Sequence, residues 1–413
     1  MPRQSSSYMA DYYTFRNFTV EAHGHRVTVA GKPGAWSWDT LNPGTAALLE
    51  VADVAPGDDV LDLGCGTGVV GAVAGILAPQ GHVTLVDCNV AAVACAERTL
   101  VANSLTNTMV RLADGVAALA PASFDLVLSH LPRGRAVQEE LIRGAAWVLR
   151  PGGRFYFVAS KHAGVKSAIA HARDLFGQCS VVRQKKGYHV ALAIRPADLP
   201  LPSPADGYVT HTITLDGVET TLVSKPGVFA WDRLDAGTAT LVGAMEIWPH
   251  DRVLDLGCGT GLAGLAAARR AGPRQLLPRQ TSEVSEDLGG FATLVDADVC
   301  AAESARRTLE ANGIANGEVL LSDCGSAVFD RRFDVVITNP PFHQGVGVDY
   351  EVACQFVRDA ARVLRRGGRL FLVANRFLRY GDLIRETFGN VATAYADSRY
   401  HVLSAVAQKA GLG

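Results

Sequence analysis

Residues 335–345 (VVITNPPFHQG) join an apolar run to Asn339, Pro340, Pro341 and Phe342. Proline has no backbone N–H to donate, so two consecutive prolines end the expected strand at Asn339. The side-chain oxygen of Asn339 and the backbone oxygen of Pro340 are hydrogen-bond acceptors, and the prolines leave them little conformational freedom. Two such acceptors can bind both N–H bonds of a planar amino group, while Phe342 can stack on its flat face. The pattern therefore suits chemistry on an amide-like or nucleobase NH2.

A second group of residues, with the pattern D-x-G-x-G-x-G, follows a short apolar strand and begins at Asp255. Gly257, Gly259 and Gly261 allow a sharp turn and let a ligand approach the backbone closely. A carboxylate before the glycines would repel a phosphate, but it suits a cationic ligand. Asp296 ends the next apolar strand, where a carboxylate can accept hydrogen bonds from two ribose hydroxyls. A glycine turn needed only for tight packing is the alternative interpretation.

The elements that position these residues occur twice. The stretch VLDLGCGTG at 60–68 returns at 253–261, and 32–50 returns as 225–243, both displaced by 193 residues. Beyond that point the displacement grows to 209 residues, so the second copy has gained 16 residues. They fall in 272–290, a polar segment with the Pro and Gly content of a surface insertion. A repeat of this length indicates a duplicated domain.

Within each copy, near-continuous apolar strands alternate with helical segments. This rhythm predicts an α/β fold, a parallel doubly wound sheet whose ligands lie at the carboxyl ends of the strands. Residues 195–207 carry four prolines and are typical of a linker. The predicted boundaries are 1–197 for the first domain, 198–207 for the linker and 208–413 for the second domain.

The glycine loop, the acid after the next strand and the strand rhythm resemble the class I S-adenosylmethionine-dependent methyltransferases, nearly from end to end of each copy. The resemblance implies two tandem Rossmann-like domains, each a mostly parallel sheet with an antiparallel last strand. It implies S-adenosylmethionine as cofactor and no metal. The cofactor-binding residues that it implies are Asp255, Gly257, Gly259, Gly261 and Asp296, with Asp323 near the adenine.

In that fold the fourth strand ends beside the sulfonium of the cofactor, so the resemblance implies that Asn339 faces the transferred methyl group. The implied catalytic residues are Asn339, Pro340, Pro341 and Phe342. Acceptors on both N–H bonds draw the amino group into position and favour a more nucleophilic nitrogen. No strong base is needed first, because positive charge already activates the leaving group. A capped strand end with a rigid turn is the alternative interpretation, since Asn-Pro commonly opens turns.

Asn-Pro-Pro-Phe is shared by enzymes that methylate adenine N6, guanine N2 and glutamine side chains. The segment KPGVFAWDRLDAGTATLV (225–242), the motif NPPFH and a tandem pair with a decayed first half are similar to the rRNA guanine-N2 methyltransferases. That resemblance implies catalysis by the second domain, ribosomal RNA or a ribosomal subunit as partner, and base stacking by Phe229 and Trp231. These two aromatics could instead cover the edge of the sheet. Methylation of adenine or of a protein glutamine, and a non-enzymatic role in ribosome assembly, are the alternatives.

The first copy departs from the pattern at 129–133 (SHLPR), where the asparagine, the first proline and the aromatic ring are missing. His130 is a candidate base, although a lone histidine at a strand end more commonly has a surface or supporting role. The first copy keeps the residues of the glycine loop and the acid after it: Asp62, Gly64, Gly66, Gly68 and Asp87. Whether it binds S-adenosylmethionine stays open.

The charge of the whole chain is nearly balanced, with 39 Lys+Arg against 41 Asp+Glu. Contacts with a polyanion must therefore come from local patches. Candidates in the first copy are Arg133, Arg135, Arg150, Arg154, Lys161, Lys166, Arg173, Arg183, Lys185 and Lys186. Candidates in the second copy are Arg362, Arg365, Arg366, Arg369, Arg376 and Arg379. Eight scattered cysteines, the lack of a signal peptide and the lack of a long apolar run predict a cytoplasmic protein outside the membrane. The duplication within one chain predicts a monomer.

Overall fold

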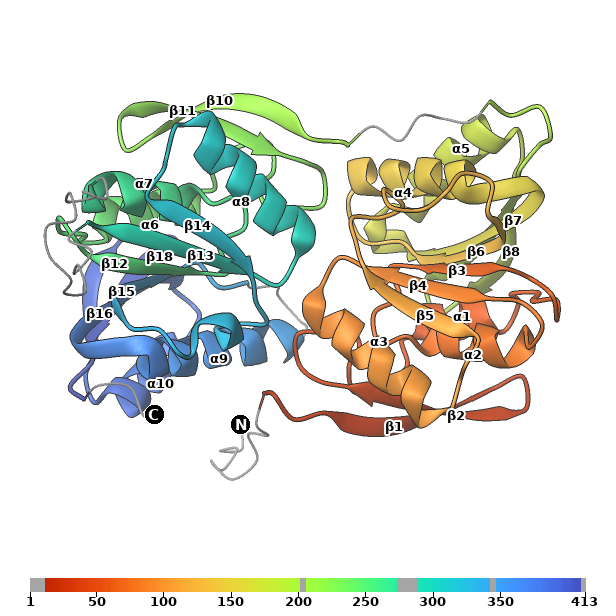
Figure 1. Cartoon of the computed structure of the whole chain (residues 1–413), viewed down its shortest axis with the longest axis horizontal. Helices are drawn as coiled ribbons and strands as arrows, with labels where there is room; N and C mark the ends of the chain where they lie inside the picture. The colour runs from red at the N-terminus through yellow and green to blue at the C-terminus, as the bar shows by residue number, and fades with distance from the viewer. Residues whose placement is uncertain (1–11, 201–205, 273–288, 342–346, 410–413) are drawn as a thin grey trace, which may run out of the picture. The chain divides into compact units, whose positions relative to one another are not determined.

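The computed structural model describes residues 12–200, 206–272, 289–341 and 347–409. The chain divides into two compact units, Met1–Ala205 and Asp206–Gly413 (Figure 1). The predicted linker at 198–207 lies partly outside the described residues, and so does most of the predicted insertion at 272–290. No helix within the described ranges is long and apolar enough to cross a membrane.

The first unit contains, in chain order, β1 (Arg16–Ala22), β2 (His25–Gly31), α1 (Pro43–Leu49), β3 (Val60–Leu63), α2 (Val69–Leu77), β4 (Val83–Asp87), α3 (Val90–Ala102), β5 (Thr108–Leu112), β6 (Phe124–His130), α4 (Arg135–Val148), β7 (Leu149–Ser160), the 3-10 turn η1 (Lys161–Ala163), α5 (Val165–Phe176), β8 (Cys179–Lys185) and β9 (Tyr188–Ile194).

The second unit repeats this order with β10 (Val209–Leu215), β11 (Val218–Ser224), α6 (Ala236–Ala244), β12 (Arg252–Leu256), α7 (Leu262–Ala271), β13 (Phe291–Asp296), α8 (Val299–Ala311), β14 (Gly317–Leu321), the 3-10 turn η2 (Ser326–Val328), β15 (Phe333–Thr338), α9 (Gly347–Val363), β16 (Leu364–Asn375), α10 (Tyr380–Phe388), β17 (Ala392–Ala396) and β18 (Tyr400–Val406).

Each unit is built on a seven-stranded sheet, with the order β5-β4-β3-β6-β7-β9-β8 in the first and β14-β13-β12-β15-β16-β18-β17 in the second. The neighbours from β14 to β16 are all parallel, whereas β18 runs antiparallel to both β16 and β17. The first unit has the same arrangement around β9. The predicted fold, a mostly parallel sheet with an antiparallel last strand, is confirmed in both units. Each sheet is preceded by an antiparallel hairpin, β1–β2 or β10–β11, which the sequence analysis did not predict.

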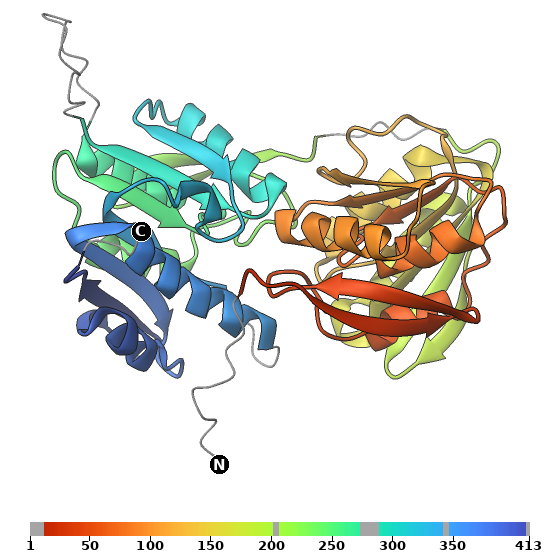
Figure 2. The ribbon, with the colours of Figure 1, turned by 60° about the horizontal axis from the view of Figure 1, so that its bottom comes forward.

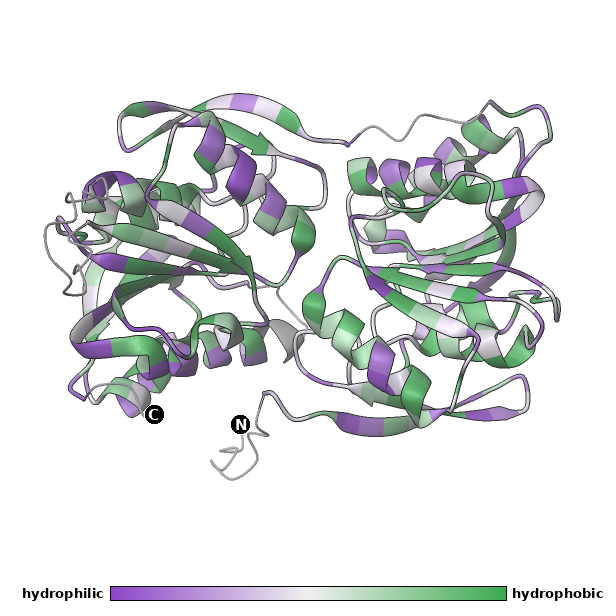
Figure 3. Cartoon of the chain, in the orientation of Figure 1, coloured by the Kyte–Doolittle hydropathy of each residue, from purple (hydrophilic) through white to green (hydrophobic). Residues whose placement is uncertain are grey.

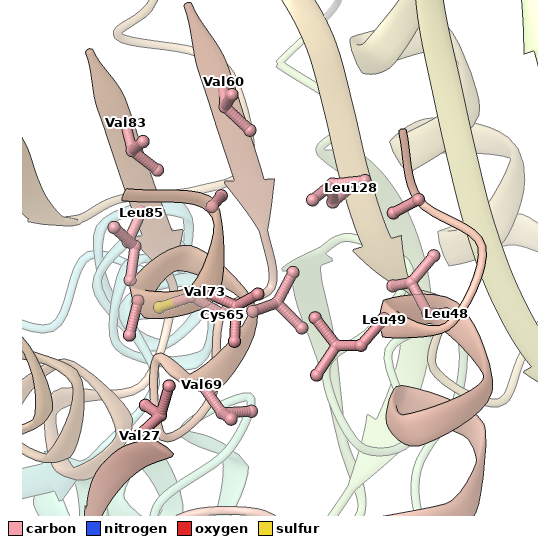
Figure 4. Close-up of a cluster of buried hydrophobic side chains, with 14 of the residues drawn as sticks. Val27, Leu48, Leu49, Val60, Cys65, Val69, Val73, Val83, Leu85 and Leu128 are labelled. Atoms are coloured by element: carbon pink, nitrogen blue, oxygen red, sulfur yellow. The ribbon is translucent and has the colours of Figure 1, made fainter. Parts of the chain in front are cut away.

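Both faces of each sheet are covered by helices, with α2 and α3 on one side and α4 and α5 on the other in the first unit (Figures 1 and 2). Neighbouring strand residues therefore enter different cores: Val60 packs with residues of α1 and α2, while Leu61 packs with residues of α4 and α5. Figure 4 shows Val60 above Val69 and Val73 of α2, with Leu128 on the neighbouring strand to its right. This double burial explains why the strands are near-continuous apolar runs, and the inner strands are largely green in Figure 3.

Candidate active site

The glycine loop of the second unit joins β12 to α7 in a left-handed backbone conformation. The φ angles of Gly257, Gly259 and Gly261 are 75°, 54° and 80°, values that residues with a Cβ rarely adopt. A Cβ on Gly261 would lie 2.8 Å from the Cβ of Ala305, so this glycine is required for packing against α8. A Cβ on Gly259 would meet no atom of the described residues within 4 Å. The loop therefore presents open backbone at Gly259, as a ligand cradle requires.

Two carboxylates, the buried Asp255 and the half-buried Asp296, brace this loop. Asp255 accepts a hydrogen bond at 2.7 Å from the backbone N–H of Gly264 in the first turn of α7. Because Gly261 has no side chain to cap that helix, Asp255 supplies the acceptor that the helix end needs. Burial raises the pKa of Asp255 to about 7. The carboxylate that the sequence analysis assigned to a cationic ligand is thus bonded to the fold, although Asp255 does line the pocket above the loop.

Asp296 ties the end of β13 to the same loop. One carboxylate oxygen accepts from the backbone N–H of Gly259 at 2.8 Å, and the other accepts from the N–H of Asp298 at 3.0 Å. Burial raises the pKa of Asp296 to about 6. Asp323 follows β14 and is half buried, and it is not among the described residues that line the pocket. Asp296 is not among those lining residues either, so the ribose contact of Asp296 and the adenine contact of Asp323 both stay predictions.

Asn339 follows the last residue of β15 and faces the glycine loop across one pocket. The residues that line this pocket include Phe229, Asp235, Thr238, Gly257, Gly259 and Asn339. The side-chain NH2 of Asn339 donates to a carboxylate oxygen of Asp235 at 3.1 Å and contacts the hydroxyl of Thr238 at 3.0 Å. The carbonyl oxygen lies at the other end of the amide, where it can accept from a substrate amino group. The structure thus brings together the amide and the glycine loop, 78 residues apart in the sequence when measured from Gly261.

The profile of the methyltransferase small domain matches the chain twice, over residues 26–192 and 219–404, once in each unit. Together the two matches cover more than half of the chain. The chain belongs to the methyltransferase small domain family.

Relatives within this family carry a more specific name. The ribosomal RNA small subunit methyltransferase C of Hahella chejuensis is 35% identical over 288 residues, which are 70% of this chain and 79% of that protein. The protein of the same name from Pseudomonas fluorescens is 36% identical over 277 residues, 66% of this chain and 76% of that protein. The predicted resemblance to the tandem-domain rRNA methyltransferases is therefore confirmed.

A solved structure extends the likeness to nearly the whole chain. The 16S rRNA N2 G1207 methyltransferase (RsmC) of T. thermophilus, solved in complex with AdoMet and guanosine, has a TM-score of 0.77 at 32% identity. The match covers 95% of this chain and 98% of the T. thermophilus chain. It supports the tandem arrangement of two methyltransferase-type units in a single chain.

The remaining predicted residues of this methyltransferase site are distributed unevenly. Phe229 lines the pocket and is 59% exposed, as a stacking residue would be. Trp231 instead packs edge-on against His211 of β10, with ring centroids 5.7 Å apart. Pro340 is buried and Pro341 is exposed. Phe342 lies outside the described residues, so its stacking role stays a prediction.

The first unit has a matching pocket above its own glycine loop, lined among others by Trp36, Asn42, Thr45, Gly64, Gly66 and His130. His130 occupies the position of Asn339, and its Nδ1 lies 3.1 Å from the hydroxyl of Thr45. The ring of Trp36 packs edge-on against His130, with centroids 4.5 Å apart. Burial lowers the pKa of His130 to about 4, so the imidazole is neutral at physiological pH. A neutral ring packed under tryptophan replaces the carboxamide.

Several cations of the first unit that are candidates for phosphate contact have partners within the unit. Arg183 and Lys185, from the densest basic cluster, both pair with Glu50. Arg150 bridges Asp59 and Asp125. These ion pairs reduce the positive charge that the first unit offers to a polyanion.

Sequence reasoning missed Asp235 and Thr238, although both lie in the quoted segment 225–242. A signal for them was present in the duplication. Asp235 becomes Asn42 in the first copy, while Asn339 becomes His130. Two positions that change between the copies and meet in one pocket are candidates for a functional pair.

Proposed function

We propose that the chain transfers the methyl group of S-adenosylmethionine to the exocyclic N2 of a guanine in ribosomal RNA, and that the second unit carries out this catalysis. The observation that carries the proposal is the shared pocket of Asn339 and the glycine loop, in which the NH2 of the amide is held by Asp235 and Thr238. The names of the relatives and the guanosine complex of the T. thermophilus protein support guanine over adenine or glutamine.

The described residues fit S-adenosylmethionine. Gly259 offers open backbone, and the carboxylate of Asp296 stands at the end of β13, ready to accept from ribose hydroxyls. When bound, the cofactor supplies a methyl group on a positively charged sulfur. The glycine loop, whose Gly257 and Gly259 line the same pocket as Asn339, would hold the cofactor.

The substrate amine is positioned by acceptors at the end of β15. The side-chain oxygen of Asn339 and the backbone oxygen of Pro340 each accept one N–H of the guanine amino group. These two hydrogen bonds orient the nitrogen lone pair toward the methyl group. Most of the rate acceleration comes from this positioning. The nitrogen loses its proton to solvent after the transfer, so no strong base is required. Phe229, exposed at the pocket, stacks on the base.

The proposal also covers the partner, the location and the oligomeric state of the protein. The partner is ribosomal RNA, met as naked RNA or within a subunit, and the chain works in the cytoplasm as a monomer. The duplication supports the monomer, because one chain already contains the two units that a dimer of single domains would supply.

Nucleoside mass spectrometry on ribosomal RNA tests the proposal. A deletion strain complemented with wild-type protein should regain one N2-methylguanine that the deletion strain lacks, and complementation with the N339A variant should not restore it. Unchanged N2-methylguanine at every rRNA site in the deletion strain would show that the substrate is wrong. Restoration by N339A together with loss in H130A would show that the first unit is the catalytic one.

A further inference from the structure

We propose that Asp235 is a positioning residue, whose carboxylate determines which end of the Asn339 amide faces the substrate. This inference rests on the proposed function, because it assigns a cause to the acceptor on which that function depends. Asp235 is the N-cap residue of α6, and Asn339 follows β15, 104 residues later. Their contact joins the start of a helix to the end of a strand, at the wall of the pocket that both residues line.

A carboxamide has two ends of almost equal shape and opposite chemistry. Its oxygen accepts hydrogen bonds and its NH2 donates them, so a rotation of the amide by 180° turns an acceptor into a donor. A donor aimed at a substrate amino group would repel it. The Asn339 site therefore works in only one of the two orientations, and some neighbour has to select it.

Asp235 can make that selection, whereas Thr238 cannot. An ionised carboxylate only accepts, so the 3.1 Å contact with Asp235 requires the NH2 end of Asn339. A hydroxyl both donates and accepts, so the 3.0 Å contact with Thr238 tolerates either end. The Thr238 hydroxyl also lies 3.5 Å from the same carboxylate oxygen, which gives its proton an acceptor and leaves a lone pair for Asn339. The carboxylate thus orients both of its neighbours.

The carboxylate is itself held in place by α6. It caps this helix by accepting from the backbone N–H of Thr238 at 2.9 Å. Gly237 leaves room for the contact: a Cβ there would lie 2.9 Å from the carboxylate oxygen and 3.4 Å from the NH2 of Asn339. Asp235 therefore caps α6 and binds Asn339, Gly237 leaves space for that contact, and Thr238 is the second partner of the amide.

Helix capping alone does not account for the aspartate. In the first unit the equivalent Asn42 caps α1 through an acceptor contact with the N–H of Gly44 at 2.7 Å. Asparagine and aspartate cap helices about equally well. Aspartate differs from asparagine in its negative charge. The first unit has no amide at position 130, and it also has no carboxylate at position 42. The acid accompanies the amide that it orients.

The test compares D235N with wild-type enzyme in single-turnover methyl transfer to rRNA from the deletion strain. The substituted amide keeps the helix cap but has a donor of its own, so it no longer dictates the orientation of Asn339. We expect the transfer rate to fall roughly 10-fold or more, the scale of a lost hydrogen bond to a charged group. The dissociation constant for S-adenosylmethionine, measured by calorimetry, should stay within about twofold of the wild-type value. The substitution affects the position of the substrate amine and not the binding of the cofactor. The N42D variant, the reverse exchange in the first unit, should leave both values unchanged.

A second variant, D235S, keeps a capping oxygen and is too short to reach Asn339, so it should lose at least as much rate as D235N. A wild-type rate in both variants would overturn the inference. A lowered melting temperature in both, in proportion to the lost rate, would also overturn it, because Asp235 would then act only through the stability of α6. An inactive wild-type enzyme would count against the proposed function itself and not against the role of Asp235 alone.

Discussion

The glycine loops at the base of the two pockets have nearly the same geometry, whereas the residues on the opposite side of each pocket differ. The three glycines of the first loop have φ angles of 78°, 53° and 76°, against 75°, 54° and 80° in the second. Asp62 accepts from Gly71 at 2.7 Å, the same length as the contact between Asp255 and Gly264. Across the pocket, however, the first unit has a neutral histidine packed under a tryptophan, while the second has an amide held by an acid.

The hydrogen bonds below each loop explain why both units retain their glycines. Each acid below the loop satisfies a backbone N–H of the fold: Asp62 supports the first turn of α2, and Asp87 accepts from Gly66 at 2.8 Å. Losing either acceptor would leave a buried or part-buried donor without this partner, which is costly whether or not a ligand binds. The first unit can therefore keep its glycine loop for folding alone. The residues opposite the loop carry the information about catalysis.

The largest effect is expected from exchanging the residues that differ. N339A removes the acceptor for the substrate amine, and we expect transfer to rRNA to fall by roughly 100-fold or more, as for the loss of one preorganised group at a reacting centre. Transfer of a labelled methyl group from S-adenosylmethionine measures it. H130A, the matched variant of the first unit, should retain the wild-type rate. Equal losses in the two variants would mean that the pockets act together.

The next effect concerns the acids that the two units share. D296N replaces one acceptor of the proposed ribose site with a donor, and we expect the dissociation constant for S-adenosylmethionine to rise about 10- to 100-fold. Isothermal calorimetry on the full chain measures the affinity and the number of sites. D87N, at the same place in the first unit, should leave the affinity and a single site unchanged. Two binding sites for S-adenosylmethionine in the wild-type protein, one of them lost in D87N, would show that both units bind the cofactor.

The pH dependence of cofactor binding should be smaller and confined to acidic solution. Burial raises the pKa of Asp296 to about 6, and ribose hydroxyls bind its ionised form. Binding should therefore be strongest above pH 6 and weaken as the pH falls, by about tenfold between pH 7 and 5. The buried Asp255, with a pKa raised to about 7, titrates nearby. Calorimetry on D296N separates the two groups: the change near pH 6 should be absent there, and its persistence would assign it to Asp255.

Much of this site can be predicted from the sequence, because a required backbone conformation restricts the residue types at its own position. A left-handed turn needs glycine, and Gly257, Gly259 and Gly261 all adopt it. The end of a buried strand shows as an apolar run followed by two prolines. The repeat then fixes both units at once, since the same marks recur at fixed displacements.

The missing parts are contacts between distant side chains. The bond between Asp235 and Asn339 spans 104 residues, and no periodicity encodes it. Asp255 has the position expected of a ligand group, but its direction, toward the N–H of Gly264, depends on how α7 packs. Trp231 likewise belongs to a promising aromatic pair, and only the hairpin at β10 reveals that it packs against His211. Direction and pairing come from tertiary structure, which a single sequence does not state.

The smallest expected effect tests the aromatic residues at the rim of each pocket. Phe229 is 59% exposed; its counterpart Trp36 is 50% exposed and packs edge-on against His130. F229A should raise the KM for RNA roughly fivefold, the low end of what stacking on a base contributes, and leave the rate at saturating RNA nearly unchanged. W36A should leave the KM unchanged, because its ring covers a histidine instead of a substrate. A larger KM effect from W36A than from F229A would mean that RNA is held at the first unit, and the two pockets would then divide binding from catalysis.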